Sequence, residues 1–328
     1  MNNKMKNTIS DRHLDKQLRP NSLLEFSGNA SLLHRLNIMI AAAKERGDPL
    51  SHLLLYGPPG LGKTTLATII AKEMESNLFT TSGPIIEKAG DLAGILTNLN
   101  HNSTLFIDEI HRLPKNVEEY LYSAMDNSSI DIIIDADKNA KTVVIPLNRF
   151  TLIGATTKAG NVSAPLRSRF STPLRMEYYT EDELSNIIIR SAKLLHVVTH
   201  QESAQEIAKR SRGTPRVANN ILHWIRDFAQ MHNQNIIDIK TVHQACHMIA
   251  IDTHGLDEMD KKILHTIIQH YSGGPVGLKA IAANLCEEEN TIEDVHEPYL
   301  LMKGFLRRTP RGREATPLAY RYFNTLNT

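Results

Sequence analysis

The sequence has little cysteine: only Cys246 and Cys286 occur among its 328 residues. Two cysteines are too few for a disulfide framework and match no metal-binding spacing, so a reducing cytoplasm is the expected location. The sequence also lacks any run of eighteen apolar residues, and its first eleven residues are polar. We therefore expect neither a membrane span nor a signal peptide.

A clear excess of charge of either sign is absent as well. The chain has 37 Lys and Arg against 36 Asp and Glu, which gives a formal net charge of +1. A protein that covers DNA with its whole surface needs concentrated Lys and Arg, so any contact with nucleic acid has to come from a local patch. The composition, 41% hydrophobic and 22% charged, is typical of globular domains, and the length predicts two or three of them.

The most specific motif is a P-loop at residues 57–65, Gly-Pro-Pro-Gly-Leu-Gly-Lys-Thr-Thr, which follows an apolar strand candidate at 52–56. Backbone N–H groups of such a loop wrap the phosphates of a nucleotide, in conformations that a Cβ would obstruct. We expect Lys63 to contact the β- and γ-phosphates and Thr64 to ligate Mg²⁺. Apolar residues recur at helical spacing over 66–74, so a helix follows whose N-terminus faces the anion.

A second strand candidate, residues 103–107, ends in Asp108 and Glu109, which has the form of a Walker B motif. Asp108 is expected to hold the Mg²⁺ shell, and Glu109 to polarise the attacking water as general base. An acidic pair after an apolar strand often only begins a solvated loop. Because this pair follows a P-loop at the appropriate distance, it indicates nucleotide hydrolysis.

Residues 150–157 predict a third buried strand that ends in Thr156 and Thr157. Either hydroxyl could sense the γ-phosphate; we favour Thr157, and a strand end simply capped by threonines stays open. A basic stretch at 164–170 then carries Arg169. An arginine supplied to the γ-phosphate of a neighbouring subunit offsets charge that develops in the transition state, whereas the alternative, a surface salt bridge, contributes little.

The pattern becomes helical from Thr180, where Thr180 and Glu183 fit a capping box. Residues 213–216, Gly-Thr-Pro-Arg, break the chain and begin another helix. Arg216 projects from its first turn, where a positive charge opposes the helix dipole. We infer that this unfavourable position serves a purpose, such as reaching nucleotide phosphates.

Residues 130–147 form two β-rich arms around a polar turn at 137–139, which predicts a hairpin inserted between the second and third strands. Pro146 keeps the second arm from being a central strand. The hairpin is either a partner-binding arm with exposed apolar side chains or an edge hairpin packed on its own domain.

The C-terminal region predicts a winged helix. Helices at 260–270 and 278–285, and a third that begins at Thr291 with Asp294 in the capping-box position, are followed by a basic strand pair at 305–313. This order of elements is typical of DNA-binding modules, although winged helices also bind proteins, and that alternative stays open.

Charge decides how such a unit would hold DNA. Residues 287–297 contain six acids and no Lys or Arg, so phosphates should repel the helix that ordinarily reads the major groove. Residues 303–313 contain five basic residues and no acid. We therefore expect the wing to contact the DNA backbone independently of sequence, through basic side chains among Lys303, Arg307, Arg308, Arg311 and Arg313.

Together these motifs resemble the RuvB family, the AAA+ motors of bacterial Holliday-junction branch migration. The resemblance extends from Leu18-Arg-Pro20 to the wing. Beyond the ATPase motifs it rests on three more specific segments: Gly-Gly-Pro-Val-Gly-Leu at 273–278, Thr-Ile-Glu-Asp-Val at 291–295 and Arg-Thr-Pro-Arg-Gly-Arg at 308–313.

The resemblance implies three domains: an α/β P-loop AAA+ ATPase domain (a parallel sheet flanked by helices) at 1–179, an all-α lid domain at 180–252 and a winged-helix DNA-binding head domain at 253–328. It implies ATP and Mg²⁺ as cofactors and a cytoplasmic homohexamer around duplex DNA at Holliday junctions. It also implies RuvA as a partner bound through hairpin 130–147, and RuvC within the same complex. The hairpin tip at 135–141 lacks the glycine and arginine usual in the family.

Site residues carry over by motif position: Arg169 resembles the arginine finger, Arg216 the second sensor, and Arg308 and Arg313 the DNA-contacting arginines. The expected catalytic residues are Lys63, Asp108, Glu109, Thr157 and Arg169. The expected nucleotide-binding residues are Leu18, Arg19, Gly60, Gly62, Lys63, Thr64, Thr65, Tyr179 and Arg216. The expected metal ligands are Thr64 and Asp108.

We therefore expect an ATP hydrolase coupled to DNA translocation, a branch-migration helicase of recombination and repair. A clamp-loader or initiator ATPase shares every ATPase motif, but the hairpin and the winged helix argue against it. A superfamily-2 helicase needs a second RecA-like domain, which the helical pattern after Thr180 does not supply. A non-enzymatic winged-helix regulator would not need Lys63, Asp108 and Glu109.

Overall fold

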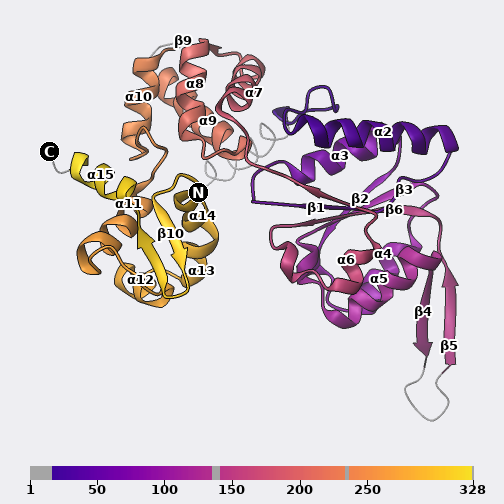
Figure 1. The fold of residues 1–328 in the computed structure, drawn as a ribbon. Coiled ribbons are helices and arrows are strands. Elements are labelled where there is room, and N and C mark those ends of the chain that lie inside the picture. The colour runs from indigo at the N-terminus through magenta and orange to yellow at the C-terminus, as the bar shows by residue number, and fades with distance from the viewer. Residues whose placement is uncertain (1–16, 135–140, 233–235, 327–328) are drawn as a thin grey trace, which may run out of the picture. The chain divides into compact units, whose positions relative to one another are not determined.

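The computed structural model describes residues 17–134, 141–232 and 236–326. They form two compact units (Figure 1). The first comprises residues up to Glu183 together with Thr214–Arg216, and the second comprises Leu184–Gly213 and residues from Val217 onward. Within the described residues, no helix has the length and apolar character needed to cross a membrane.

A five-stranded parallel sheet forms the centre of the first unit, in the order β2-β3-β6-β1-β7. Its strands are β1 (Leu53–Tyr56), β2 (Leu78–Ser82), β3 (Ser103–Asp108), β6 (Phe150–Thr156) and β7 (Thr172–Arg175). The three strands expected from the sequence, β1, β3 and β6, are confirmed. They are the buried, central ones, which is why their sequences read as continuous apolar runs.

Helices cover both faces of this sheet, α2 and α3 on one and α4, α5 and α6 on the other (Figure 1). Their bounds are α2 (Ala30–Arg46), α3 (Lys63–Glu73), α4 (Ala89–Thr97), α5 (Lys115–Asn127) and α6 (Ala164–Arg169), with short 3-10 turns η1 (Gly83–Ile85), η2 (Ile110–Arg112) and η3 (Ala159–Asn161). Apolar side chains of α4, α5 and α6 pack with those of β3 and β6 in one buried cluster. The predicted α/β fold class is therefore confirmed.

The predicted hairpin is present as β4 (Ser129–Ile134) paired antiparallel with β5 (Lys141–Pro146). It forms a two-stranded sheet of its own and extends away from the central sheet (Figure 1). Ile130 at its base is buried, whereas Val144 is 60% exposed. The tip singled out in the sequence, from 135 to 140, lies outside the described residues.

Four helices follow, which lie mostly in the second unit: α7 (Glu181–Leu194), α8 (Gln201–Arg210), α9 (Pro215–Met231) and α10 (Ile239–Met248), with a short parallel pair β8 (Val198–Thr199) and β9 (Ile236–Ile237). The expected capping box is formed at the start of α7. The Thr180 N–H donates to the Glu183 carboxylate at 2.8 Å, and the Glu183 N–H donates to Thr180 Oγ1 at 3.2 Å. Helix α9 begins at Pro215 as expected.

A winged helix completes the second unit, as the sequence predicts. Its elements are α11 (Glu258–His265), η4 (Thr266–His270), α12 (Leu278–Leu285), α13 (Glu289–Thr291), η5 (Ile292–His296), α14 (Glu297–Met302), β10 (Leu306–Thr309), β11 (Gly312–Ala315) and α15 (Pro317–Leu326). The expected helix start at Thr291 is wrong. The Glu288 carbonyl already accepts hydrogen bonds from the N–H groups of Thr291 and Ile292, so the helix begins at Glu289.

Candidate functional site

The P-loop connects β1 to α3 and has the conformations that its glycines permit. Gly57, Gly60 and Gly62 have φ values of 147°, 79° and 93°. A Cβ on Gly57 would lie 2.3 Å from the Met176 carbonyl oxygen, so no other residue fits there. No side chain caps the N-terminus of α3, which leaves its first N–H groups for an anion.

Lys63 lies at the first turn of α3 with only 7% of its surface exposed. Its Nζ donates to the carbonyl oxygens of Gly57 at 2.8 Å and Pro58 at 2.9 Å. Burial lowers the pKa of Lys63, and the nearby charges of Asp108 and Glu109 raise it in part. The expected lysine and both expected carboxylates therefore lie in one electrostatic environment.

The two carboxylates follow β3, at the same sheet edge as the P-loop. Asp108 is the last residue of β3, and its Oδ1 accepts the Glu109 N–H at 3.0 Å. Glu109 Oε2 lies 3.3 Å from Thr157 Oγ1, which donates to it, and 3.2 Å from His111 Nδ1. The expected general base is thus held by two neighbouring side chains.

The two threonines at the end of β6 differ in their surroundings. Thr156 is fully buried; its hydroxyl lies 2.9 Å from His111 Nδ1 and accepts the Lys158 N–H at 3.0 Å. Thr157 is partly exposed and contacts Glu109. This geometry favours Thr157 as the residue that meets a γ-phosphate.

His111 bridges Glu109 and Thr156, a role that sequence reasoning missed. The signal was present, because His111 follows Glu109 by two residues within the Asp-Glu-Ile-His run. Its positioning also depends on β6, whose end lies beside that of β3, and this proximity is visible only in the sheet order.

Oxygen ligands suited to Mg²⁺ lie close to the P-loop. The Asp108 carboxylate ends β3, and the half-buried Thr64 is in the first turn of α3. Hydroxyl and carboxylate oxygens are the ligands that this hard cation prefers. The side chains present therefore fit the metal expected at a P-loop.

Three of the other expected nucleotide contacts also lie at the P-loop. The Tyr179 hydroxyl donates to the Leu61 carbonyl oxygen at 3.2 Å. The Arg216 N–H donates to the Gly60 carbonyl oxygen at 3.4 Å. Thr65 lies in the first turn of α3 beside Gly62. Of the remaining two, Leu18 is buried and Arg19 is exposed.

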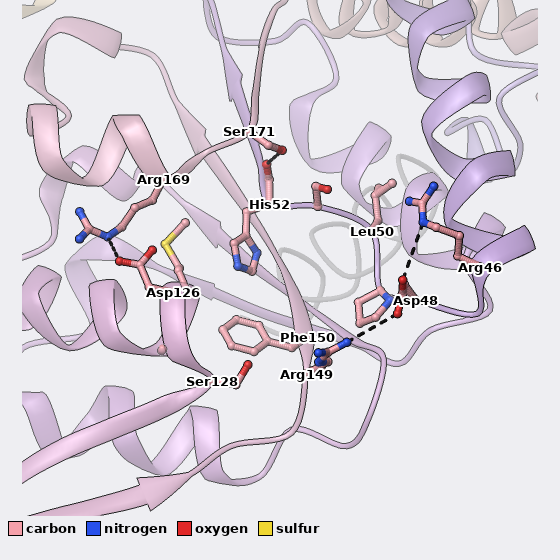
Figure 2. Close-up of a pocket in the computed structure, with 14 residues that line it drawn as sticks. Arg46, Asp48, Leu50, His52, Asp126, Ser128, Arg149, Phe150, Arg169 and Ser171 are labelled. Carbon is pink, nitrogen blue, oxygen red and sulfur yellow. Dashed lines mark hydrogen bonds and ion pairs between the residues drawn. The ribbon is translucent and has the colours of Figure 1, made fainter.

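Arg169 lines a pocket with residues that precede or begin β1 and β6 (Figure 2). Its Nε is 2.8 Å from Asp126 Oδ2, its guanidinium lies 4.4 Å over the Tyr122 ring, and its Nη1 donates to the Pro165 carbonyl oxygen at 2.8 Å. The pocket has a volume of about 420 Å³, and His52 lines it as well. No sequence motif pointed to Asp126 or Tyr122, because both are far from Arg169 along the chain.

The position of that pocket separates Arg169 from the P-loop. Residues that precede or begin β1 and β6 line the pocket, whereas Lys63, Asp108 and Thr157 lie at or beyond the carboxyl ends of their strands. Strands of four to seven residues at about 3.3 Å per residue put the two edges roughly 13 to 23 Å apart. Arg169 therefore lies too far away to reach a γ-phosphate bound to its own P-loop.

The wing arginines are paired with acids of the preceding helices. Arg308 Nε lies 2.6 Å from Glu297 Oε1, and Arg313 Nη2 lies 2.9 Å from Glu297 Oε2. Glu293 contacts both arginines as well. Arg311 is exposed between the two wing strands. Acids and bases that form separate blocks in the sequence are thus neighbours in space.

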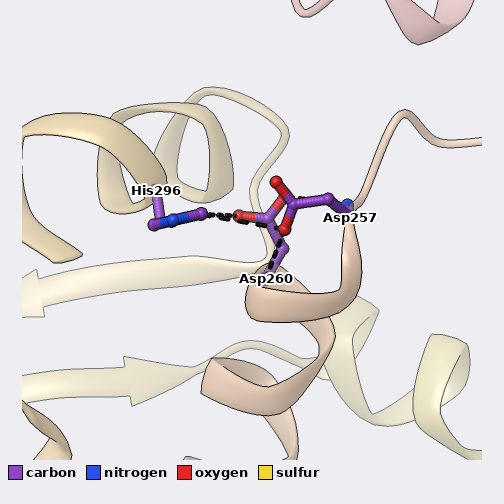
Figure 3. A group of neighbouring side chains, drawn as sticks. All are labelled: Asp257, Asp260 and His296. Carbon is purple, nitrogen blue, oxygen red and sulfur yellow. Dashed lines mark hydrogen bonds and ion pairs between the residues drawn. The ribbon is translucent and has the colours of Figure 1, made fainter. Parts of the chain in front are cut away.

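Asp257, Asp260 and His296 form a second cluster of potential metal ligands (Figure 3). Arg212 Nη2 lies 2.7 Å from Asp257 and 2.5 Å from Asp260, and His296 Nδ1 lies 2.8 Å from Asp260. The guanidinium therefore supplies the positive charge that these carboxylates need. This cluster is an ion-pair network that joins the end of α8 to the start of α11.

Three family models together match the described chain almost from end to end. The model described as "Holliday junction DNA helicase RuvB P-loop domain" matches residues 18–176, "RuvB AAA lid domain" matches 179–252 and "RuvB C-terminal winged helix domain" matches 253–324. The chain belongs to the RuvB family.

Individual RuvB proteins are similar over their whole length. A protein of Protochlamydia amoebophila named "Holliday junction branch migration complex subunit RuvB" is 55% identical over 97% of this chain and 98% of its own. The protein of the same name in Limosilactobacillus reuteri is 56% identical over 93% of this chain and 90% of its own. The solved structure of the Thermotoga maritima RuvB Holliday junction branch migration motor superposes with a TM-score of 0.85 at 49% identity, covering 94% of this chain and 98% of that one. RuvB membership makes the P-loop a nucleotide-binding site.

Proposed function

We propose that this protein is an ATP-driven DNA motor that moves Holliday junctions in recombination and repair. The observation that carries the proposal is the split ATPase site. Its P-loop side lies at the carboxyl ends of the strands and consists of Lys63, Asp108, Glu109 and Thr157, whereas Arg169 lies near their amino ends. Such a site is complete only when two subunits meet. The names of the relatives supply the substrate, a four-way junction.

In this mechanism Lys63 and the N-terminus of α3 bind the phosphates of ATP. Thr64 and Asp108 would hold Mg²⁺, which neutralises charge on the β- and γ-phosphates. Glu109, whose carboxylate is oriented by Thr157 and His111, takes a proton from the attacking water. Arg169 of the neighbouring subunit offsets the charge that develops on the γ-phosphate, and Arg216 and Tyr179 couple the nucleotide to the lid.

The assembly that we propose is a cytoplasmic homohexamer around duplex DNA, with domain boundaries at residues 179/180 and 252/253. RuvA would bind the β4–β5 hairpin, whose exposed Val143 and Val144 give an apolar contact surface. RuvC would act within the same complex. Arg308, Arg311 and Arg313 would contact the DNA backbone.

The test uses a synthetic four-way junction, ATP, Mg²⁺ and RuvA. We expect the full chain to hydrolyse ATP faster in the presence of duplex DNA, and to convert the junction into two duplexes when RuvA is added. ATP hydrolysis without junction movement, with or without RuvA, would favour a clamp-loader or initiator ATPase. Junction binding without any ATP hydrolysis would instead favour a winged-helix regulator.

A further inference from the structure

Glu297 lies beneath the wing, and its side chain is 1% exposed. Its Oε1 accepts from Arg308 Nε at 2.6 Å and from Arg313 Nε at 3.1 Å, and its Oε2 accepts from Arg313 Nη2 at 2.9 Å. Burial alone raises the pKa of Glu297, but the hydrogen bonds from the two arginines outweigh burial and lower it. Glu297 is therefore a fixed anion that orients both guanidinium groups.

The two arginines need such an anion because of the strand register. Arg308 and Arg313 lie directly opposite each other in the antiparallel β10–β11 pair. Like charges in that position repel each other. A buried carboxylate between them removes this repulsion and restricts their rotamers, so the arginines are held side by side.

Glu293 contacts the same pair from a more accessible position. Its side chain is 39% exposed, and its Oε1 lies 2.9 Å from Arg308 Nη2 and 3.4 Å from Arg313 Nη2. Two guanidinium Nη2 groups thus converge on one oxygen of a partly exposed side chain. Arginine guanidinium groups that converge on one anionic oxygen are suited to bind a phosphate oxygen in its place.

We propose that Arg308 and Arg313 form a binding site for one DNA backbone phosphate, that Glu293 occupies this site until a phosphate oxygen displaces it, and that Glu297 is the positioning residue for both arginines. The inference rests on the proposed DNA motor function and adds roles for two glutamates. It also explains why an acidic helix adjoins a basic wing: Glu293 weakens the contact with DNA, and Glu297 aligns it.

The test compares two substitutions that change the net charge equally. Glu293→Gln and Glu297→Gln each remove one negative charge. Glu288→Gln, at an exposed position of the same acidic segment, removes one as well and serves as the matched control. Binding of the full chain to a fluorescent duplex is measured by anisotropy over about 50 to 200 mM salt, a range in which phosphate contacts weaken strongly.

We expect Glu293→Gln to raise duplex affinity about three- to tenfold and Glu288→Gln to change it less than about twofold. Glu297→Gln should lower duplex affinity about tenfold, although it changes the net charge equally. The amide N–H₂ of the glutamine would face Arg313 Nη2, which now donates to Glu297 Oε2, so two donors would meet. An equal rise in Glu293→Gln and Glu297→Gln would mean that only net charge matters and would overturn the positioning role. No change in Glu293→Gln would overturn the displacement.

A second measurement does not depend on the buried residue. In the Arg308→Gln background, Glu293→Gln should no longer raise affinity, since one fork of the site is missing; an undiminished rise would contradict the proposal. Melting curves show whether Glu297→Gln remains folded. Failure of the unsubstituted chain to bind duplex DNA at any salt concentration would overturn both the phosphate site and the proposed motor function, whereas the outcomes above overturn the roles of the glutamates alone.

Discussion

Glu109 adopts a left-handed backbone conformation immediately after β3, with a φ of 48°. Such a conformation is costly for a residue with a Cβ and persists only where the surrounding structure enforces it. Here Thr157 and His111 hold the carboxylate, and the Asp108 side chain holds its N–H. We infer that the strain is retained because it directs Glu109 toward the position of the attacking water.

Glu109→Gln should lower kcat for ATP hydrolysis about 10²- to 10⁴-fold, the usual contribution of a general base. ATP affinity should stay nearly unchanged, because Lys63 and the α3 N-terminus remain. Steady-state hydrolysis and equilibrium binding of a fluorescent ATP analogue give the two values. Glu119→Gln, an exposed acid on α5, is the control and should leave both unaffected. A variant with normal kcat would exclude Glu109 as the base.

His52 makes the stability of the first unit depend on pH. Its Nδ1 accepts the Leu152 N–H at 2.9 Å, and burial lowers its pKa, although Met125 and Asp126 raise it in part. Below the unfolded pKa of 6.5 the unfolded chain therefore binds more protons than the folded one. Stability should be complete above that pH and decrease as the pH falls toward the folded pKa, by at most about 1.4 kcal/mol per pH unit.

Melting of the full chain between pH 8 and pH 5.5, roughly one unit or more to either side of that pKa, measures this dependence. His52→Asn keeps an acceptor without a titrating ring and should flatten the decrease. His101→Asn, at an exposed histidine of the same unit, should leave it in place. An identical slope in His52→Asn would assign the acid sensitivity to other groups.

At the scale of elements, the sequence predicted the buried strands well and the peripheral ones poorly. β1, β3 and β6 are flanked by strands on both sides and read as apolar runs. β2 and β7 are the edge strands. β2 has no fully buried residue and β7 contains Pro173, so neither has a distinctive pattern. The third helix of the head begins before Thr291. The Glu288 carbonyl accepts the N–H groups of Thr291 and Ile292, so Thr291 lies inside the helix and does not cap it with Asp294 as expected.

The ion-pair network of Arg212, Asp257, Asp260 and His296 should contribute to the stability of the second unit. The Asp260 side chain is fully buried and bonds to both Arg212 and His296. Asp260→Ala should lower the free energy of unfolding by about 3 to 5 kcal/mol, because it removes the buried carboxylate that both Arg212 and His296 contact. Urea unfolding followed by circular dichroism measures the loss.

The matched control lies on the same helix. Glu258 forms an exposed ion pair with Lys262 in α11, and Glu258→Gln should hardly move the unfolding transition. A similar effect of the two substitutions would contradict the special role of the buried network. This network was not predictable from the sequence, since Arg212 and Asp260 are 48 residues apart and meet only through packing.

At the scale of the whole molecule, the opposite placement of Arg169 and the P-loop predicts that neighbouring subunits share each ATPase site. Lys63→Ala and Arg169→Ala chains should each be inactive alone. Mixed together they should recover part of the ATPase activity, because a Lys63→Ala subunit can lend its Arg169 to the intact P-loop of an Arg169→Ala subunit. Hydrolysis measured over a range of mixing ratios tests this.

A second mixture provides the control. Lys63→Ala and Glu109→Gln both damage the P-loop side of the site, so no subunit in that mixture has an intact P-loop side, and no activity should return. Absence of rescue in both mixtures, at every ratio, would contradict a shared site. Rescue in both mixtures would mean that Lys63 and Glu109 do not have to be intact in the same subunit.

The sequence by itself determined the chemistry and the order of the elements. The P-loop and the Asp108-Glu109 pair are local, since their function depends on backbone conformations and spacings set within a few residues. Their recognition required no knowledge of packing. The winged helix was equally visible, because its helices and wing follow one another in sequence.

Tertiary structure alone decided which groups face each other. Sequence blocks of six acids and five bases suggested separated charges, yet Glu293 and Glu297 pair with Arg308 and Arg313 once the wing folds back on the helix. Likewise, only the parallel sheet shows that Arg169 lies at one edge and Lys63 at the other. Charge interactions depend on distance in space, which spacing along the chain does not fix beyond a few residues.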